Sequence, residues 1–316
     1  MSLIVQNGGG LVTVQDRGRF GYQRFGFSTG GALDRDALAA ANALVGNALG
    51  EAVLEILLAP PALTAEELTF CAVTGGGFAP VVNGAPVPLY RAFCLHPGDR
   101  LTFAPAPGAC ACLAVAGGFD LPLVMGSRST NLKCAVGGYE GRKLRAGDAL
   151  PLREPPAFLP GLTARALPAP ALPGRQVTLR CVPGPQDDLF TARGKARFFH
   201  EYYTVTADFD RMGCRFDGGA VETVRGSDIV SDGIAPGAVQ IPPSGKPIVM
   251  LADRQTTGGY AKIATVVSCD LPRLAQCAPG TRVRFQPVSI EEAQAAARTA
   301  QRKEAALASA FETILY

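Results

Sequence analysis

PGDRLTF at residues 97–103 and PGTRVRF at residues 279–285 have the same sequence pattern, and each stands late in its half of the chain. Both begin with a Pro-Gly pair, which is typical of a tight turn, and continue with alternating polar and apolar side chains. This alternation is typical of a strand with one buried face. AGDALPL at residues 146–152 has a related form. The pattern therefore predicts strands that begin directly after tight turns.

Other apolar runs predict further short strands. They lie at residues 111–116, 177–182, 239–241, 247–252 and 263–267. Glycine and proline are abundant, with 37 and 25 residues among 316, which indicates many turns. Aromatic residues make up only 7% of the chain. We expect a mainly β protein with a few helices and exclude a helical bundle.

Three segments predict those helices. Residues 33–45 are rich in Ala and Leu, with Asp34 near the start and a Gly-Asn stop at the end. Residues 185–199 begin with a proline, which suits a first helical turn. Residues 289 to about 311 are Ala-rich and begin with Ser289 and Glu292 in the spacing of a capping box.

A proline-rich stretch between residues 153 and 176 divides the chain into two halves. Proline removes backbone donors and favours extended geometry in the preceding residue, which is typical of an irregular connector. A chain of 316 residues also suits two domains. We expect a first β domain at residues 1–155, a connector at 156–175, a second β domain at 176–288 and a C-terminal helix at 289–316.

The composition restricts the partners and the compartment. A formal net charge of +3 without a basic run argues against binding to nucleic acid. The longest uncharged stretch, residues 101–119, contains two prolines, so no membrane span is expected. Residues 1–10 lack the features of a signal peptide. Nine cysteines without a Cys-x-x-Cys motif indicate reduced thiols, so we expect a cytoplasmic protein.

Familiar catalytic motifs are weak or missing in the sequence. GFSTG at residues 26–30 has the Gly-x-Ser-x-Gly form, but basic, glycine-rich residues precede it and no buried strand does. Cys94, His96, Cys110 and Cys112 have the types of zinc ligands, yet their spacing favours core packing, and no metal site is expected. Neither a Walker A motif nor a Rossmann glycine fingerprint occurs.

Three polar clusters are the candidate sites. The first combines QDRGRFG at residues 15–21 with GGALD at 30–34 and Asn42, the second is MGSRST at 125–130, and the third is DRQTTGGY at 253–260, preceded by DRMG at 210–213. Arg suits carboxylate or phosphate groups, and hydroxyls with backbone donors can complete an oxyanion pocket. The alternative interpretation is that Asp and Arg pair internally and that the glycines mark turns.

These clusters resemble the biotin-dependent carboxyltransferase-like family, also labelled allophanate hydrolase subunit 2, which includes the C subunit of 5-oxoprolinase and the KipA proteins. The resemblance runs from about residue 11 to 290. The matching phrases are TVQDRGRFGYQRFG, STGGALDRDALAAANALVGN, AVAGGFDLPLVMGSRST, GPQDDLF, DRMGCRF, SDGIAPGAVQIPPSGKPIVMLADRQTTGGYAKIATV and PGTRVRF.

The resemblance implies two cyclophilin-like β-barrel domains in tandem. It also implies one component of a multi-subunit ATP-dependent 5-oxoprolinase, in which a KipI-like B subunit and an A subunit help to open 5-oxoproline to glutamate. ATP is then expected at or through a partner subunit. Two alternatives stay open: a urea carboxylase-like carboxyltransferase subunit that uses biotin on another protein, and a KipA-type regulatory protein that antagonises a kinase inhibitor.

We assign expected roles from residue type and clustering, within this resemblance. The expected catalytic residues are Asp253, Arg254, Thr256, Thr257, Arg128 and Asp34. The expected substrate-binding residues are Ser127, Ser129, Thr130, Gln255, Tyr260, Arg211, Gln15, Asp16 and Arg19. The hypothesis requires that side chains from these distant segments converge on one anion-holding groove.

Overall fold

The structure is a computed structural model that describes residues 1–155 and 161–311. The chain divides into two compact units. The first comprises Met1–Phe20, Gly30–Leu172 and residues 302–311, and the second comprises Gly21–Thr29 and Pro173–Gln301. Part of the predicted connector, residues 156–160, and the end of the predicted C-terminal helix, residues 312–316, lie outside the described residues.

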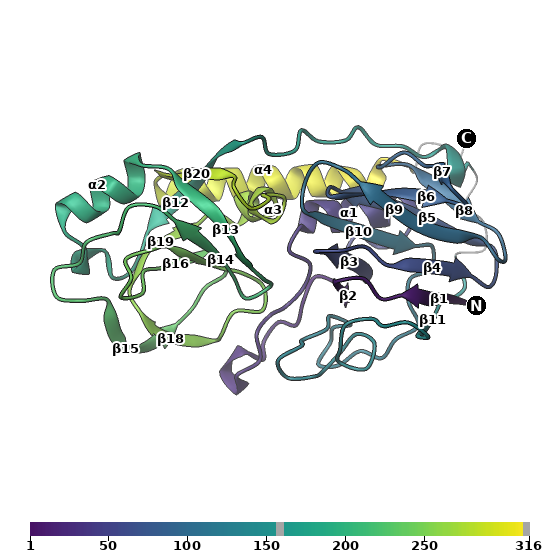
Figure 1. The fold of residues 1–316 in the computed structure, drawn as a ribbon, viewed down its shortest axis with the longest axis horizontal. Coiled ribbons are helices and arrows are strands. Elements are labelled where there is room, and N and C mark those ends of the chain that lie inside the picture. The colour runs from purple at the N-terminus through teal and green to yellow at the C-terminus, as the bar shows by residue number, and fades with distance from the viewer. Residues whose placement is uncertain (156–160, 312–316) are drawn as a thin grey trace. The chain divides into compact units, whose positions relative to one another are not determined.

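The first unit consists of two antiparallel sheets (Figure 1). The six-stranded sheet has the order β11 (Ala149–Pro151), β1 (Ser2–Asn7), β4 (Ala62–Ala65), β9 (Arg100–Pro105), β6 (Phe78–Val82) and β7 (Ala85–Pro86). The five-stranded sheet has the order β2 (Leu11–Gln15), β3 (Val53–Leu57), β10 (Cys110–Val115), β5 (Thr69–Gly75) and β8 (Ala92–Leu95).

One hydrophobic core joins the two sheets. Its members include Leu3 and Leu101 from the six-stranded sheet and Leu54 and Leu113 from the five-stranded sheet. Helix α1 (Arg35–Leu44) packs a second core against the opposite face of the five-stranded sheet. Because both faces are covered, every residue of β10 is buried, which explains its continuous run of apolar residues.

The second unit contains a closed seven-stranded barrel. Its strands follow the order β12 (Gln176–Pro183), β19 (Lys262–Val266), β16 (Ala238–Gln240), β17 (Ile248–Met250), β14 (Gly213–Asp217), β13 (Tyr203–Phe209) and β20 (Arg282–Pro287). Phe285 stacks on Phe198 with ring centroids 4.6 Å apart and meets Phe216 edge-on at 5.6 Å. These aromatic rings form part of the barrel's core.

Helices and short segments complete the described chain. They are α2 (Ala192–His200), α3 (Leu271–Ala275), α4 (Ile290–Ser309), the two-stranded ribbon of β15 (Asp228–Gly233) and β18 (Thr257–Tyr260), and the 3-10 turns η1 (Gln23–Phe25), η2 (Leu162–Ala164), η3 (Asp187–Leu189) and η4 (Ser268–Asp270). None of the helices in the described ranges has the length and hydropathy that a membrane span requires.

The prediction of a mainly β protein with few helices is confirmed. PGDRLTF leads into β9 and PGTRVRF into β20, and both Gly98 and Gly280 have the positive φ that a tight turn favours. The capping box at α4 is also present, because Ser289 and Glu292 exchange hydrogen bonds of 2.8 and 3.2 Å.

Two expectations differ from the structure in detail. The helix expected from residue 185 begins only at Ala192, because Thr191 Oγ1 caps it by accepting from Gly194 N at 2.9 Å. The resemblance implied a barrel in each half, whereas the strands of the first unit belong to two separate hydrogen-bonded sheets. One sheet ends at β7, where Pro86 cannot donate a ladder hydrogen bond, as is typical of an edge strand.

Candidate functional site

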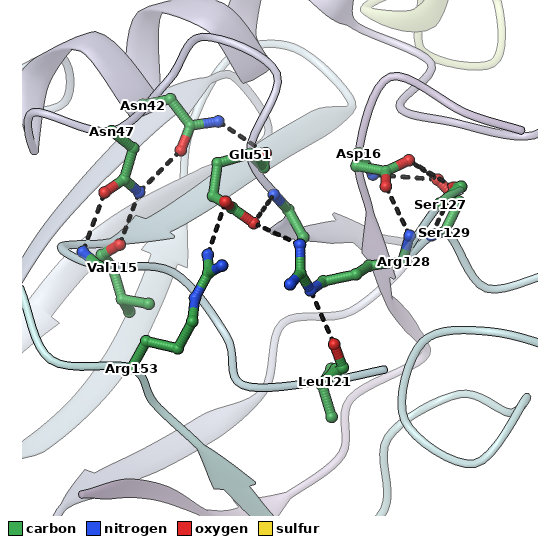
Figure 2. Close-up of polar contacts among 12 residues, drawn as sticks. Asp16, Asn42, Asn47, Glu51, Val115, Leu121, Ser127, Arg128, Ser129 and Arg153 are labelled. Carbon is green, nitrogen blue, oxygen red and sulfur yellow. Dashed lines mark hydrogen bonds and ion pairs between the residues drawn. The ribbon is translucent and has the colours of Figure 1, made fainter. Parts of the chain in front are cut away.

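The first candidate site centres on Asp16, directly after β2. Its Oδ1 accepts from the hydroxyls of Ser127 at 2.7 Å and Ser129 at 2.5 Å and from Gly18 N at 2.7 Å. Its Oδ2 accepts from Arg128 N at 2.6 Å (Figure 2). Asp16 is 8% exposed and both serines are fully buried. The carboxylate therefore fixes residues 127–129 against the end of β2, with both of its oxygens engaged.

Gln15, Arg19 and Thr130 extend this network. Thr130 donates its backbone N–H and its hydroxyl to Val14 O, at 2.9 and 3.1 Å. Gln15 Nε2 donates to Thr130 O at 3.1 Å, and Arg19 Nη2 donates to Ser129 O at 2.9 Å. All three side chains are fully buried. Residues 125–130 are consequently held along most of their length by the segment 14–19.

Two glycines permit this close packing. Gly137 and Gly138 both have positive φ. A Cβ at Gly137 would collide with the carbonyl of Ser129, and a Cβ at Gly138 would collide with the hydroxyl of Thr130. Any larger residue there would displace the segment that Asp16 holds.

Beside the Asp16 network, one carboxylate contacts two arginines. Glu51 Oε1 lies 3.4 Å from Arg128 Nη1, and Glu51 Oε2 lies 2.5 Å from Arg153 Nη2 (Figure 2). Arg128 also donates from Nε to Leu121 O at 2.8 Å. The three side chains carry a net charge of +1 and are each between 15% and 33% exposed. This group, the Glu51 cluster, can therefore attract an anion while its guanidinium groups stay oriented.

Two asparagines position the Glu51 cluster. Asn42 Nδ2 donates to Glu51 O at 2.8 Å, and Asn47 Nδ2 donates to Asn42 Oδ1 at 3.0 Å and to Val115 O at 2.8 Å (Figure 2). Asn42 lies on α1 and is fully buried. These amides tie the end of α1 to β10 and to the backbone that carries Glu51.

Asp34 is the N-cap of α1. Its Oδ1 accepts from Ala37 N at 2.9 Å, and the side chain is 5% exposed. A helix-capping role accounts for this contact. The catalytic role expected for Asp34 stays a prediction.

A row of polar residues crosses the five-stranded sheet below α1. Glu55 on β3 faces Thr13 on β2 and Cys112 on β10, and Cys112 faces Thr74 on β5. Glu55 is fully buried and accepts from Leu33 N at 2.6 Å. Glu55 is not among the site residues expected from the sequence. It is, however, the one charged residue in the apolar strand VLEIL, and a charged residue in such a strand is unusual enough to indicate a special role.

The thiols beside this row are poor candidates for nucleophiles. A hydrogen bond with Cys112 and burial both raise the pKa of Cys110, so the thiol stays protonated near neutral pH. All nine cysteines are free. Within residues 1–155 and 161–311, no group of three or more His, Cys, Asp or Glu side chains could hold a metal ion.

The second unit contains the third cluster. Arg211 Nε and Nη2 donate to the two carboxylate oxygens of Asp253 at 2.9 and 3.1 Å. Both side chains are buried, with 3% and 8% exposed. Arg254 is 1% exposed and donates from Nε to Ile234 O at 2.9 Å. The internal Asp-Arg pairing named as the alternative interpretation is therefore present in this cluster.

The rest of this cluster faces outward. Gln255, Thr257 and Tyr260 are exposed, and Thr256 is half-buried with its carbonyl accepting from Ile234 N at 3.0 Å. Thr257 and Tyr260 are the first and last residues of β18. The hydroxyls expected to contact substrate are thus accessible to it.

Lys262 and Gln240 are further polar residues near this cluster. They face each other on β19 and β16 beside a β-bulge. Only 4% of the Lys262 side chain is exposed, and Nζ lies 3.2 Å from Asp232 Oδ2. Gln240 Nε2 is buried and has no hydrogen-bond partner in the described part of the chain. Lys262 was not among the expected site residues, because a lysine inside a strand pattern is usually a surface residue.

The structure thus brings together the first and second clusters, and it joins residues 210–213 to Asp253. Apart from Gly21, the first two clusters lie in the first unit, and the third lies in the second unit. Each group is a hydrogen-bonded set in its own unit, and their convergence on one groove stays a prediction.

The chain matches a known protein family over most of its length. The family model described as the carboxyltransferase domain, subdomain A and B, matches residues 25–287. This range includes the second and third clusters and most of both units.

Similar proteins include one curated relative and two solved structures. The C subunit of 5-oxoprolinase from Haemophilus influenzae is 39% identical, over 89% of this chain and 89% of that protein. The crystal structure of TTHA0988 has 36% identity and a TM-score of 0.82, and the match covers 90% of this chain and 55% of that one. The urea amidolyase of K. lactis has 28% identity and a TM-score of 0.88, covering 97% of this chain and 20% of that one. The chain therefore spans about half of TTHA0988 and about a fifth of the amidolyase.

Proposed function

Because the chain belongs to the carboxyltransferase domain family of subdomains A and B, we propose that it is the C subunit of a 5-oxoprolinase. The observation that supports this proposal most directly is the extent of the similarity to the Haemophilus influenzae protein, which includes nine-tenths of both chains.

In the proposed reaction, 5-oxoproline, ATP and two molecules of water give glutamate, ADP and phosphate. A lactam is a poor electrophile, so ATP first phosphorylates its oxygen. Water then adds to the activated carbon and the ring C–N bond breaks, which leaves an acyl phosphate of glutamate and frees the amino group. A second water hydrolyses this acyl phosphate to glutamate and phosphate. Such a site needs cationic groups for the substrate carboxylate and the phosphoryl group, and donors for the oxygen on which charge develops.

The Glu51 cluster supplies cationic groups of this kind. Glu51 neutralises one of its two guanidinium groups, which leaves a positive charge for an anionic substrate group. Arg128 is held on three sides, by Glu51, by Leu121 O and through its backbone N–H by Asp16. An oriented guanidinium loses little conformational entropy when it binds a carboxylate. We assign Arg128 to the substrate carboxylate or the phosphoryl group.

The third cluster supplies a carboxylate and hydroxyls. Two nitrogens of Arg211, Nε and Nη2, donate hydrogen bonds to the carboxylate of Asp253 and orient it. Thr256 and Thr257 follow Asp253 closely along the chain. We assign Asp253 to positioning the attacking water and the threonine hydroxyls to hydrogen bonds with the developing oxyanion.

The proposal includes partners and a compartment. The name of the Haemophilus influenzae relative designates one of several subunits. We propose that this chain acts with a KipI-like B subunit and with an A subunit, that ATP binds at or through one of them, and that the complex is cytoplasmic.

A second candidate function is carboxyl transfer. The similarity to the K. lactis urea amidolyase favours it, since that fold covers almost the whole of this chain. The same anion-binding groups would then serve a carboxyl group delivered by biotin on another protein. Transfer of label from carboxybiotin to an acceptor by the purified complex would support this function over ring opening.

The test is a reconstituted assay of ATP-dependent glutamate formation from 5-oxoproline. Omission of this chain from the three subunits should abolish product. Undiminished turnover without the chain would contradict the proposal and favour a regulatory role of the KipA type.

A matched pair of variants tests the site. Arg254→Ala should lower turnover at least tenfold in the complete complex, whereas Arg175→Ala, at an exposed position of the same unit, should leave it unchanged. Chemical unfolding of both variants shows whether a loss of activity comes from a loss of fold. Wild-type turnover by a folded Arg254→Ala complex would remove that residue from the site.

A further inference from the structure

The strand β15 has a free edge. It pairs with β18 along one side, and no other strand of the described residues pairs with it (Figure 1). A two-stranded ribbon of this kind gains little stability by itself, and an unpaired edge presents backbone donors and acceptors to another chain. The outer side of β15 is therefore able to accept a third strand.

The side chains of β15 leave it uncovered on both faces. Five of its six residues are exposed, and Ile229 is half-buried. Val230 is 94% exposed, and Val224 just before the strand is 66% exposed. Free edges are commonly protected by lysine, proline or a covering element. The middle of β15 has no such cover, because Val230 there is nearly fully exposed between Asp228 and Asp232.

A groove runs beside the same strand. It has a volume of about 490 Å³, and its lining includes Gln186, Leu189, Ile229 and Val230. Of these lining residues, Leu189 is buried and Val230 is almost fully exposed. The groove therefore offers space for a side chain of the strand that would add to β15, and part of its wall is aliphatic.

The charged residues of the groove suggest what enters it. Asp188, Arg225 and Asp228 line it and are exposed, and none of them has an ion pair within the described part of the chain. Two carboxylates against one guanidinium leave a net negative charge. A lysine or arginine on the incoming strand would complement it.

A second copy of this chain is a poor occupant. Antiparallel pairing of two β15 strands about Val230 would set Asp228 of one copy opposite Asp232 of the other. Like charges in directly opposite positions destabilise a strand pair. A different polypeptide is a better occupant, and the similarity to a protein named as one subunit of an enzyme indicates that such polypeptides exist.

We propose that the free edge of β15 and the adjoining groove form the docking surface for an extended segment of a partner subunit. The segment adds as a third strand and directs an aliphatic and a basic side chain toward the groove. Backbone hydrogen bonds would supply affinity and the two side chains specificity, as in other cases of strand addition. The identity of the partner rests on the proposed function.

The test measures binding of the purified chain to the purified A and B subunits from the same genome by titration calorimetry. Val230→Lys places a charge on the free edge and repels a basic strand, so we expect Kd to rise at least tenfold. Because Val230 is almost fully exposed, the substitution should leave stability unchanged. Leu68→Lys, at a position 48% exposed in the first unit, is the matched control and should bind like the wild type.

The outcomes separate this proposal from the proposed function. Wild-type Kd for Val230→Lys, with normal glutamate formation, would overturn only the docking surface. A homodimer of the isolated chain that Val230→Lys dissociates in sedimentation experiments would also overturn it. If Val230→Lys binds its partner more weakly than the wild type does, and the wild-type complex forms no glutamate, the docking surface is supported and the proposed function is contradicted.

Discussion

The carboxylate of Asp16 accepts hydrogen bonds from two hydroxyls and two backbone N–H groups, and three of these four donors come from residues 127–129. Charge-assisted hydrogen bonds are stronger than neutral ones, and a buried donor that loses its acceptor carries a desolvation cost. The same contacts orient the backbone on which Arg128 stands. At the scale of single residues, Asp16 therefore links the stability of the first unit to the geometry of its candidate site.

Asp16→Asn should destabilise the protein by about 3 kcal/mol, because the amide removes the charge and turns an N–H₂ group toward existing donors. Urea unfolding with an unchanged m-value would measure this difference. Asp120→Asn is the matched control, since Asp120 is exposed, and it should change stability by less than about 0.5 kcal/mol. Equal stability of the two variants would contradict the role given to Asp16.

The sequence predicted this part of the site only incompletely. The residue types of the first two clusters indicated an anion site, but the contact of Asp16 with Ser127 spans 111 residues, and local patterns contain no information on such distances. Glu51 and Arg153 were missed for the same reason. Each is an ordinary charged residue in sequence, and only the fold makes them neighbours of Arg128.

At the scale of elements, Asp34 of α1 suits two interpretations, as the N-cap of the helix and as a catalytic residue. Asp34 caps the helix through Ala37 N, while Glu55 and Thr74 below it contact Leu33 N and Ala37 O at 2.6 and 2.7 Å. The first turn of α1 is thus fixed from its cap and from the sheet. Loss of the cap should weaken the helix without unfolding the unit.

Asp34→Ala should destabilise the protein by about 1 kcal/mol, because the N-cap acceptor is lost, whereas Asp34→Ser keeps an acceptor and should be close to the wild type. Glutamate formation by the complete complex then separates the two roles. A stable Asp34→Ser variant with at least tenfold lower turnover would support the catalytic role. Full turnover with normal stability would leave Asp34 as a helix cap alone.

The sequence predicts an element well where interactions between residues close together in the chain determine it. Turn glycines, the capping box and the alternating strands after residues 97 and 279 all occur as expected. Residues 185–199 were misread because Pro185 suits a first helical turn, yet a 3-10 turn precedes the Thr191 cap. Closure of strands into a barrel depends on pairing between β12 and β20, more than 100 residues apart, which no local pattern specifies.

At the scale of the whole molecule, each unit contains its own hydrophobic core. Leu54 and its neighbours form the core of the first unit, and Phe285 with Phe198 and Phe216 lies in the barrel of the second. Because these cores share no member, we expect them to lose stability separately. This expectation concerns packing within each unit and requires no particular arrangement of the two.

Phe285→Ala should destabilise the second unit by about 3–5 kcal/mol, because Phe285 is fully buried and its removal leaves a cavity among aromatic rings. Hydrogen exchange followed by mass spectrometry should then show faster exchange in β12, β13 and β20, while β10 in the first unit stays protected. Leu54→Ala is the reciprocal variant and should accelerate exchange in β3 and β10 but not in the barrel. If either substitution accelerates exchange uniformly across both units, the two cores form one cooperative system and the independence argued here is wrong.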